Sequence, residues 1–344
     1  MHDVPIGIQA SGLRREQDLT GSIDVPADRY WGAGTQRALA AGEATACPMP
    51  DSLFRCYGYL RRAAVIIATQ AGRLPPWKAA AIVRATADLT EGRLVREFPL
   101  GFRQYSDAAL AAINVNEVLA NRTAQLLGAP PGSREPIEPL LDLAFGPGPD
   151  AAFTAALFIA AVLAIEQTLV PPCTALARAL ARNPEQSRLR AALLRIDEAE
   201  GSLHEIAAEP PDATGLAPED WTLMTAVVAA DTGRPFIVAP QPFCGRAALD
   251  APVAAMAAVR GLAIVLLDIA ASLNTGAELP QAAALAKLCR CVIEQDRTVV
   301  AAASHRGAAT DGTARAIIAA SLLGSLQRLA DGCRTLSRIV ARTR

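Results

Sequence analysis

The sequence predicts an all-α protein built around a bundle of long helices. Hydrophobic residues make up 51% of the 344 positions but aromatic residues only 4%, so the core is built mainly from Ala, Leu, Val and Ile. Long stretches carry apolar residues at intervals of three and four, as helices with one buried face do. The alternation typical of strands is almost missing, apart from a short extended piece predicted at Phe236–Ala239.

The N-terminal part, residues 1–144, is predicted to be a helical domain of short helices and turns. Asp24–Pro26 and Pro50–Asp51 carry turn signals, and helices are expected over Asp51–Gly72 and Pro76–Glu91. The linker Phe145–Asp150, rich in Pro and Gly, then opens a second domain over residues 145–344.

The second domain is predicted to be the central long-helix bundle. Pro171–Pro172 should kink its first helix, because proline removes a backbone donor and clashes with the preceding turn. Several of these helices are longer than the average of about 11 residues, which is typical of a bundle. The expected helices are Ala151–Arg182, Gln186–Ala208, Glu219–Asp231, Gly245–Ser272, Pro280–Ala303 and Asp311–Arg342.

Charge and hydropathy argue against nucleic acid and membrane partners. The formal net charge is only -1, which gives no field that would attract nucleic acid or an anionic membrane. The most apolar stretch is free of charge only over Ala151–Ile165, which is shorter than the roughly 20 residues needed to span a bilayer. Met1–Arg15 does not contain the apolar core that a secretory signal has.

Cysteine and histidine usage predicts no metal site, no cofactor and a cytoplasmic location. The seven cysteines form no Cys-x-x-Cys pair, and three histidines offer no zinc-ligand spacing. Reduced, packed thiols are therefore expected, as in a cytosolic protein, including Cys289 and Cys291, which have no histidine beside them.

Several runs, in this order along the chain, resemble class II fumarases of the fumarase/aspartase superfamily. The resemblance implies a long-helix bundle that assembles as a tetramer, with each active site shared by three subunits. The chain is expected to lack the family's small C-terminal domain, since it stops at Arg344 near the end of the bundle. The matching runs are Gly21–Ala38 (GSIDVPADRYWGAGTQRA), Arg96–Leu100 (REFPL), Ala112–Arg122 (AINVNEVLANR), Thr232–Leu249 (TGRPFIVAPQPFCGRAAL) and Leu329–Arg334 (LADGCR).

The hydroxyl and amide donors that this family uses to hold a small dicarboxylate are replaced. In the register of the family's Ser-Gly-Thr-Gln-Ser-Asn run, the chain has Asp107 followed by Ala108, Ala109, Leu110, Ala111 and Ala112. The Asn-x-Asn-Glu that follows is kept as Asn114, Asn116 and Glu117. These three side chains either pair with backbone and hold the fold, which we favour, or face a ligand.

Two further anion-binding runs are altered in the same way. The Ser-Ser-Asn-Asp run falls on Gly148, Pro149, Asp150 and Ala151, and the accessory His-Pro-Asn-Asp motif falls on Glu138, Pro139, Leu140 and Leu141. Glu138 would repel an anion rather than bind it.

The proton-transfer groups of the family have no counterpart. Nothing between Arg182 and Thr214 matches its Thr-His pair, and neither His204 nor His305 lies in that register. The mobile loop that carries the family's catalytic serine is replaced by Ala271–Ala286, which joins the flanking helices directly.

Two functions are compatible with this pattern. The first is a non-catalytic homologue that forms a homo-oligomer, tetramer or dimer, or binds a protein partner. The second is a repurposed lyase-like enzyme or small-molecule binder for an amine-bearing or non-dicarboxylate ligand. Its candidate pocket residues are Asp107, Asn114, Asn116, Glu117, Glu138 and Asp150. Hydration of fumarate by the usual route is not expected, because base, water-orienting group and anion-binding donors are lost together.

Overall fold

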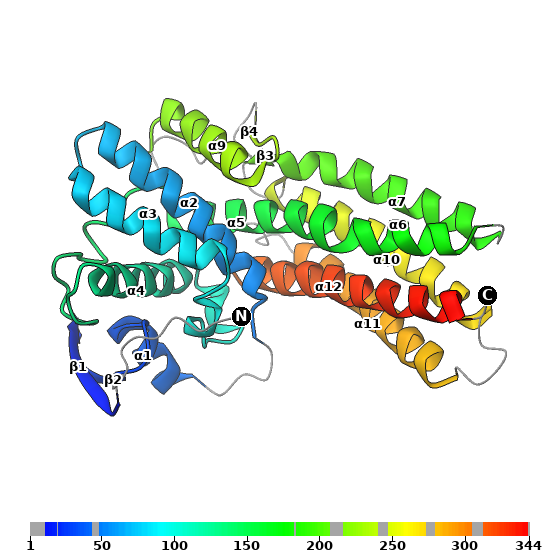
Figure 1. Cartoon of the computed structure of the whole chain (residues 1–344), viewed down its shortest axis with the longest axis horizontal. Helices are drawn as coiled ribbons and strands as arrows, with labels where there is room; N and C mark the ends of the chain where they lie inside the picture. The colour runs from blue at the N-terminus through cyan, green and yellow to red at the C-terminus, as the bar shows by residue number, and fades with distance from the viewer. Residues whose placement is uncertain are drawn as a thin grey trace. The chain divides into compact units, whose positions relative to one another are not determined.

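The computed structural model confirms a mostly helical protein (Figure 1). It describes residues 11–18, 20–42, 48–181, 184–206, 216–239, 247–272, 279–304 and 312–342. Cys47, Cys244, His305 and the segment 273–278, within the predicted loop replacement, lie outside the described residues.

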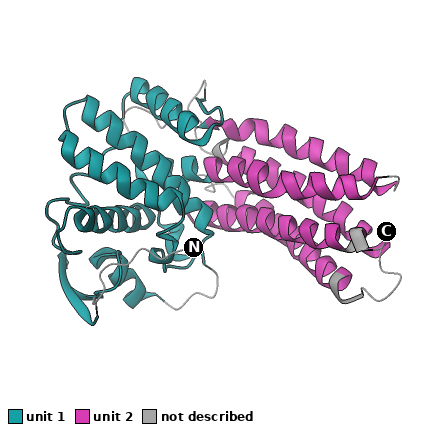
Figure 2. Ribbon diagram, in the orientation of Figure 1, with its two compact units in different colours: residues 1–157, 206–243 teal, residues 158–205, 244–344 magenta. Residues whose placement is uncertain are grey.

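The chain forms two compact units, neither of which is one continuous stretch (Figure 2). The first unit holds residues 1–157 and 206–243, and the second holds residues 158–205 and 244–344. The predicted division at residue 144 is continuous in sequence, whereas in the structure 206–243 joins the N-terminal part. The ion pair between Arg62 Nε and Asp231 Oδ2, 2.8 Å long, is one contact that ties this later segment to it.

The first unit combines a two-stranded hairpin with a set of helices. Helices α2 and α3 begin within two residues of the predicted starts, with Asp51 in the first turn of one and Pro76 opening the other, both favoured at those places. Its main elements are β1 (Leu13–Asp18), β2 (Gly21–Pro26), α1 (Ala33–Ala41), α2 (Asp51–Gln70), α3 (Pro76–Thr90), α4 (Ala108–Leu126) and α9 (Pro218–Thr232).

The hairpin β1–β2 was not expected from the sequence. Its strands pair antiparallel, with Asp18 opposite Gly21, so Asp24–Pro26 belongs to a strand and not to a turn. Periodicity missed it because the strands bury few residues, and Val25 is the one fully buried apolar side chain among them. The extended piece predicted at Phe236–Ala239 is confirmed as β4 (Ile237–Val238), which pairs with β3 (Glu205–Ile206).

The second unit is the long-helix bundle, entered through α5 (Pro149–Leu163). Its core is aliphatic, and side chains such as Leu176, Leu262, Leu266 and Leu326 are completely buried. The bundle contains α6 (Val170–Ala179), α7 (Glu185–Gly201), α10 (Ala247–Ser272), α11 (Leu279–Ser304) and α12 (Gly312–Arg342).

A π-helical turn precedes Pro171–Pro172, where the sequence predicts a kink. Ala164–Leu169 is π-helix, and α6 starts directly after it with the prolines in its first turn, so the helical path continues to Ala179. A π turn re-routes the backbone bonds that proline would break, because each amide there reaches a carbonyl five residues back.

Two helical stretches are long and apolar enough to cross a membrane by length and composition. They are Pro149–Ala179 and Leu249–Ser272, and 61% and 56% of their most apolar windows is buried inside the protein. Core helices of a bundle meet the same criterion, so these stretches are weak evidence for a membrane span.

Candidate functional site

A cavity of about 200 Å³ lies in the first unit, where the hairpin, α1, α4 and the segment after α4 meet. Two of the predicted site residues, Asn116 and Glu117, line it. We call it the Asn116 cavity. Its lining consists of Glu16, Gln17, Asp18, Thr20, Ala33, Gly34, Ile113, Asn116, Glu117, Asn121, Gly132, Arg134, Pro139 and Leu140.

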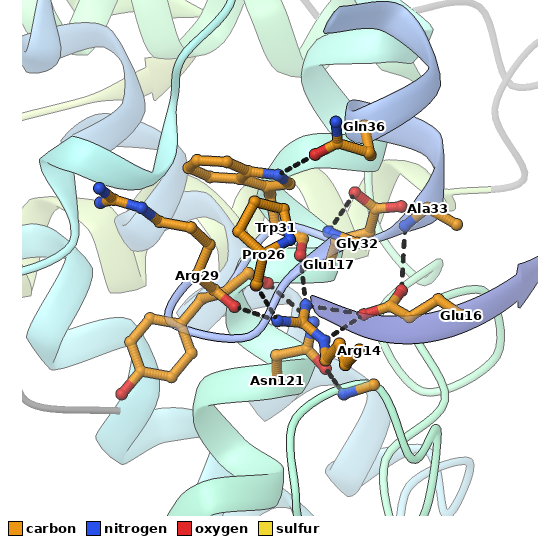
Figure 3. A network of polar contacts seen from close by, with 12 residues as sticks. Arg14, Glu16, Pro26, Arg29, Trp31, Gly32, Ala33, Gln36, Glu117 and Asn121 are labelled. Atoms are coloured by element: carbon orange, nitrogen blue, oxygen red, sulfur yellow. Dashed lines mark hydrogen bonds and ion pairs between the residues drawn. The ribbon is translucent and has the colours of Figure 1, made fainter. Parts of the chain in front are cut away.

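Glu117 fastens α4 to the start of α1 (Figure 3). Its Oε1 accepts from the Gly34 N–H at 2.7 Å, and its Oε2 accepts from the Gly32 N–H at 2.9 Å and the Thr35 hydroxyl at 2.7 Å. Burial raises the pKa of the Glu117 carboxyl, and these hydrogen bonds oppose that rise. The carboxylate therefore acts as a cap for the amides at the beginning of α1.

The approach of this carboxylate depends on glycine. A Cβ at Gly32 would lie 2.8 Å from Glu16 Oε2 and 2.9 Å from Glu117 Cδ, and one at Gly34 would lie 2.8 Å from Ile113 Cγ2. All three distances are shorter than normal contacts, so side chains at positions 32 and 34 would prevent the two carboxylates and Ile113 from packing against this turn of backbone.

Glu16 is the second carboxylate in this turn. It is buried, accepts from the Ala33 N–H at 2.9 Å and pairs with Arg14 Nε at 2.8 Å. Arg14 in turn donates to the carbonyls of Pro26, Arg29 and Trp31, which fixes the loop between β2 and α1 (Figure 3). The Arg14–Glu16 ion pair therefore stabilises the fold by holding the loop between β2 and α1 in place.

Asn116 differs from its neighbours because its amide oxygen is unused. The residue is 6% exposed, and among the described residues nothing donates a hydrogen bond to its buried Oδ1. A buried acceptor of this kind costs free energy unless a donor reaches it, so each case calls for an explanation. Its place in the cavity lining offers one, namely a bound molecule with a donor.

Asn114 and Asn121, on the same helix, hold the fold together. Asn114 is fully buried; its Oδ1 accepts from the Tyr105 hydroxyl at 2.7 Å and its Nδ2 donates to the Glu97 carbonyl at 3.1 Å. Asn121 donates to the Tyr30 carbonyl and accepts from the Gly132 N–H, at 2.8 and 2.7 Å. Asn114 is thus placed as the preferred interpretation of this motif expects.

Comparison with known proteins identifies the family. The chain is 31% identical to the class II fumarate hydratase of Myxococcus xanthus, over 95% of this chain and 82% of that protein. The chain belongs to the class II fumarase family. It is also 33% identical to the enzyme of Methanosarcina acetivorans, in a match that covers 79% of this chain and 63% of that relative. No family model matches the chain.

Solved structures agree on the fold. The crystal structure of class II fumarase from Schistosoma mansoni superposes with a TM-score of 0.85 at 20% identity, covering 95% of this chain and 83% of that one. The predicted fumarase-type helical bundle is confirmed.

The remaining predicted site residues lie outside the lining of the Asn116 cavity. Asp107 is exposed and caps α4, accepting from the Ala109 N–H at 2.9 Å, and Asp150 is exposed in the first turn of α5. Glu138 pairs with Arg134 Nη2 at 2.7 Å, next to the cavity but not in its lining. Each of the two aspartates lies at the N-terminus of a helix, where an acidic side chain stabilises the helix. Binding of a ligand by Asp107 and Asp150 stays a prediction.

One group of side chains in the second unit has the composition of a metal-ligand set. Glu166 from the π-helix, Glu200 from α7 and His204 from the turn after it offer one ligand atom each, all within 4.8 Å of one another. His204 Nε2 lies 3.7 Å from Glu200 Oε1. Carboxylate oxygens and imidazole nitrogens are both able to bind zinc. Sequence spacing missed this group because Glu166 is far from the other two along the chain.

Proposed function

We propose that this class II fumarase-family chain does not hydrate fumarate and instead serves as an oligomeric, partner-binding scaffold. The supporting observation is that Asn114 and Glu117, kept from the family's motif, spend their hydrogen bonds on Tyr105 and on the backbone of Glu97, Gly32 and Gly34. Both side chains therefore make their hydrogen bonds within the protein, as a role in holding the fold requires.

The residues around this motif support the same proposal. Ala109, Ala111 and Ala112 stand where the family resemblance expects hydroxyl or amide groups. Methyl groups cannot stabilise the negative charge that develops when a dicarboxylate loses a proton, and each missing donor typically costs a factor of about 100 to 1,000 in rate. The combined loss removes any useful catalysis by the usual route.

The test is a hydration assay that follows the ultraviolet absorbance of fumarate. The class II fumarate hydratase of Myxococcus xanthus serves as the positive control at equal concentration. We expect no rate above the protein-free background from this chain, with circular dichroism verifying that it is folded. Turnover within the ordinary enzymatic range of about 1 to 1,000 per second would refute the proposal.

The scaffold part of the proposal calls for a homo-oligomer, dimer or tetramer. Its support is that the most apolar windows of Pro149–Ala179 and Leu249–Ser272 are only 61% and 56% buried within one chain. Apolar surface of that kind is usually covered by a partner. Sedimentation velocity should give an integer multiple of the chain mass above one, and a monomer at all concentrations would contradict it.

We also propose a cytoplasmic location, supported by the described cysteines, all five of which are free thiols. Cell fractionation with thiol labelling tests it. A second function, binding of a small molecule, is favoured by the unused amide oxygen of Asn116.

A further inference from the structure

We propose that the Asn116 cavity binds a small organic ammonium ion with a short aliphatic body, its N–H donating to Asn116 Oδ1. The proposal concerns binding in the first unit and does not depend on whether the chain hydrates fumarate.

The first argument is the need for a donor. Asn116 is nine-tenths buried, lines the cavity and has an Oδ1 that receives no hydrogen bond from the described residues. The other two asparagine amides of α4, on Asn114 and Asn121, each make two hydrogen bonds. The helix therefore satisfies the amides of Asn114 and Asn121, and the unsatisfied one belongs to a residue that lines the cavity. A ligand N–H completes it.

The second argument is the sign of charge around the cavity. Three carboxylates line it, on Glu16, Asp18 and Glu117, against one guanidinium, on Arg134. Arg134 already forms an ion pair, 2.7 Å long, with Glu138, a residue next to the cavity lining in the sequence. An anionic ligand would thus meet more negative than positive groups.

The charge of Glu117 decides the balance. Arg14 pairs with Glu16 at 2.7 Å, and Arg37 pairs with Asp18 at 2.9 Å, so these two carboxylates are matched by cations. Glu117, in contrast, receives its hydrogen bonds from neutral donors, the amides of Gly32 and Gly34 and the amide and hydroxyl of Thr35. When Glu117 is ionised, a cation in the cavity supplies the charge that its protein partners do not.

The third argument is size and lining. A volume of about 200 Å³ holds roughly six or seven non-hydrogen atoms, at the volume of about 30 Å³ that one water molecule occupies in the liquid. Ile113, Pro139 and Leu140 give the cavity an apolar wall. The wall suits a short branched alkyl group, while Asn116 and the carboxylates suit its ammonium head.

The experiment compares three probes that share one alkyl body. Isoamylamine carries an ammonium head at pH 7, isovaleramide a neutral amide and isovalerate a carboxylate. In isothermal titration we expect isoamylamine to bind at least about tenfold more tightly than isovaleramide, and isovalerate not to bind. Equal or tighter binding of isovalerate or isovaleramide, or no binding of isoamylamine, would overturn the proposal.

Three variants locate the binding. Asn116→Leu removes the acceptor at similar volume and should weaken isoamylamine at least about tenfold. Leu140→Trp should do the same by filling the cavity from a position that is 50% exposed, so that folding is preserved if Asn116→Leu is unstable. Leu141→Trp is the matched control, because Leu141 is 80% exposed and does not line the cavity. If Leu140→Trp leaves affinity unchanged, the cavity is not the binding site.

These outcomes are separate from the hydration assay. Titration with isoamylamine uses no fumarate, so the ligand proposal can fail while the chain remains inactive as a hydratase. Equally, measured hydration of fumarate would leave the binding result standing.

Discussion

Replacing Asn114 by alanine should destabilise the protein by about 3 kcal/mol. Asn114 makes two buried hydrogen bonds, with the Tyr105 hydroxyl at 2.7 Å and the Glu97 carbonyl at 3.1 Å. Each bond contributes about 0.5–1.5 kcal/mol net, and a buried partner left without one costs a further 1–3 kcal/mol. Because Asn114 is 0% exposed, water cannot take its place.

The matched control is Asn116→Ala, a buried amide on the same helix. Its Oδ1 receives no hydrogen bond from the described residues, so its removal should cost less than about 1 kcal/mol. The assay is urea unfolding at pH 7 followed by circular dichroism, with the two variants compared at equal slope. If Asn116→Ala costs as much as Asn114→Ala, the division into a structural and a ligand-facing amide is refuted.

Three further predictions use other contacts. Gly32→Ala should lower the free energy of unfolding in urea by about 1–3 kcal/mol, because the new Cβ would lie 2.8 Å from Glu16 Oε2. Gly261→Ala is the control: this glycine lies in a helix, nothing lies within 4 Å of the new Cβ, and the change should stabilise by about 0.5–1 kcal/mol. The reverse order of the two stabilities would contradict the steric argument. Arg37 holds the pKa of the Asp18 carboxyl well below its usual range, so this ion pair stabilises the folded protein above about pH 4, and its contribution is lost as the pH falls. Asp18→Asn should therefore make the free energy of unfolding depend less on pH in the acid range. An unchanged dependence of stability on pH would argue against this. Burial raises the pKa of Cys289 to about 12, so iodoacetamide at pH 8 should label the partly exposed Cys291 at least about tenfold faster, as peptide mass spectrometry can show; equal rates would refute it.

The long helices were predictable from the sequence and the hairpin was not. Helices such as α10 and α12 bury aliphatic residues at regular intervals over many turns, so periodicity identifies them. Strand β1 reads LRREQD and is held by Arg14, Glu16 and Asp18 through polar contacts. A strand stabilised by ion pairs and by carbonyls distant in the chain leaves no alternating pattern to detect.

The candidate site was predicted in part. The resemblance drew attention to Asn116 and Glu117, and both line the cavity. Its other walls include Glu16, Gln17 and Gly132, which no motif singles out, because only the folded hairpin and the segment after α4 bring them beside α4. The division of labour between Asn114 and Asn116 is likewise invisible in the sequence, since it depends on where Tyr105 and Glu97 lie.

The most direct test of the central claim is proton NMR of fumarate in deuterium oxide with the chain at a concentration close to that of fumarate. This measurement detects even a few turnovers, because addition of water would give monodeuterated malate with its own signals. We predict a fumarate signal that decays no faster than in a protein-free tube over a day. Appearance of deuterated malate in proportion to the amount of protein would contradict the account.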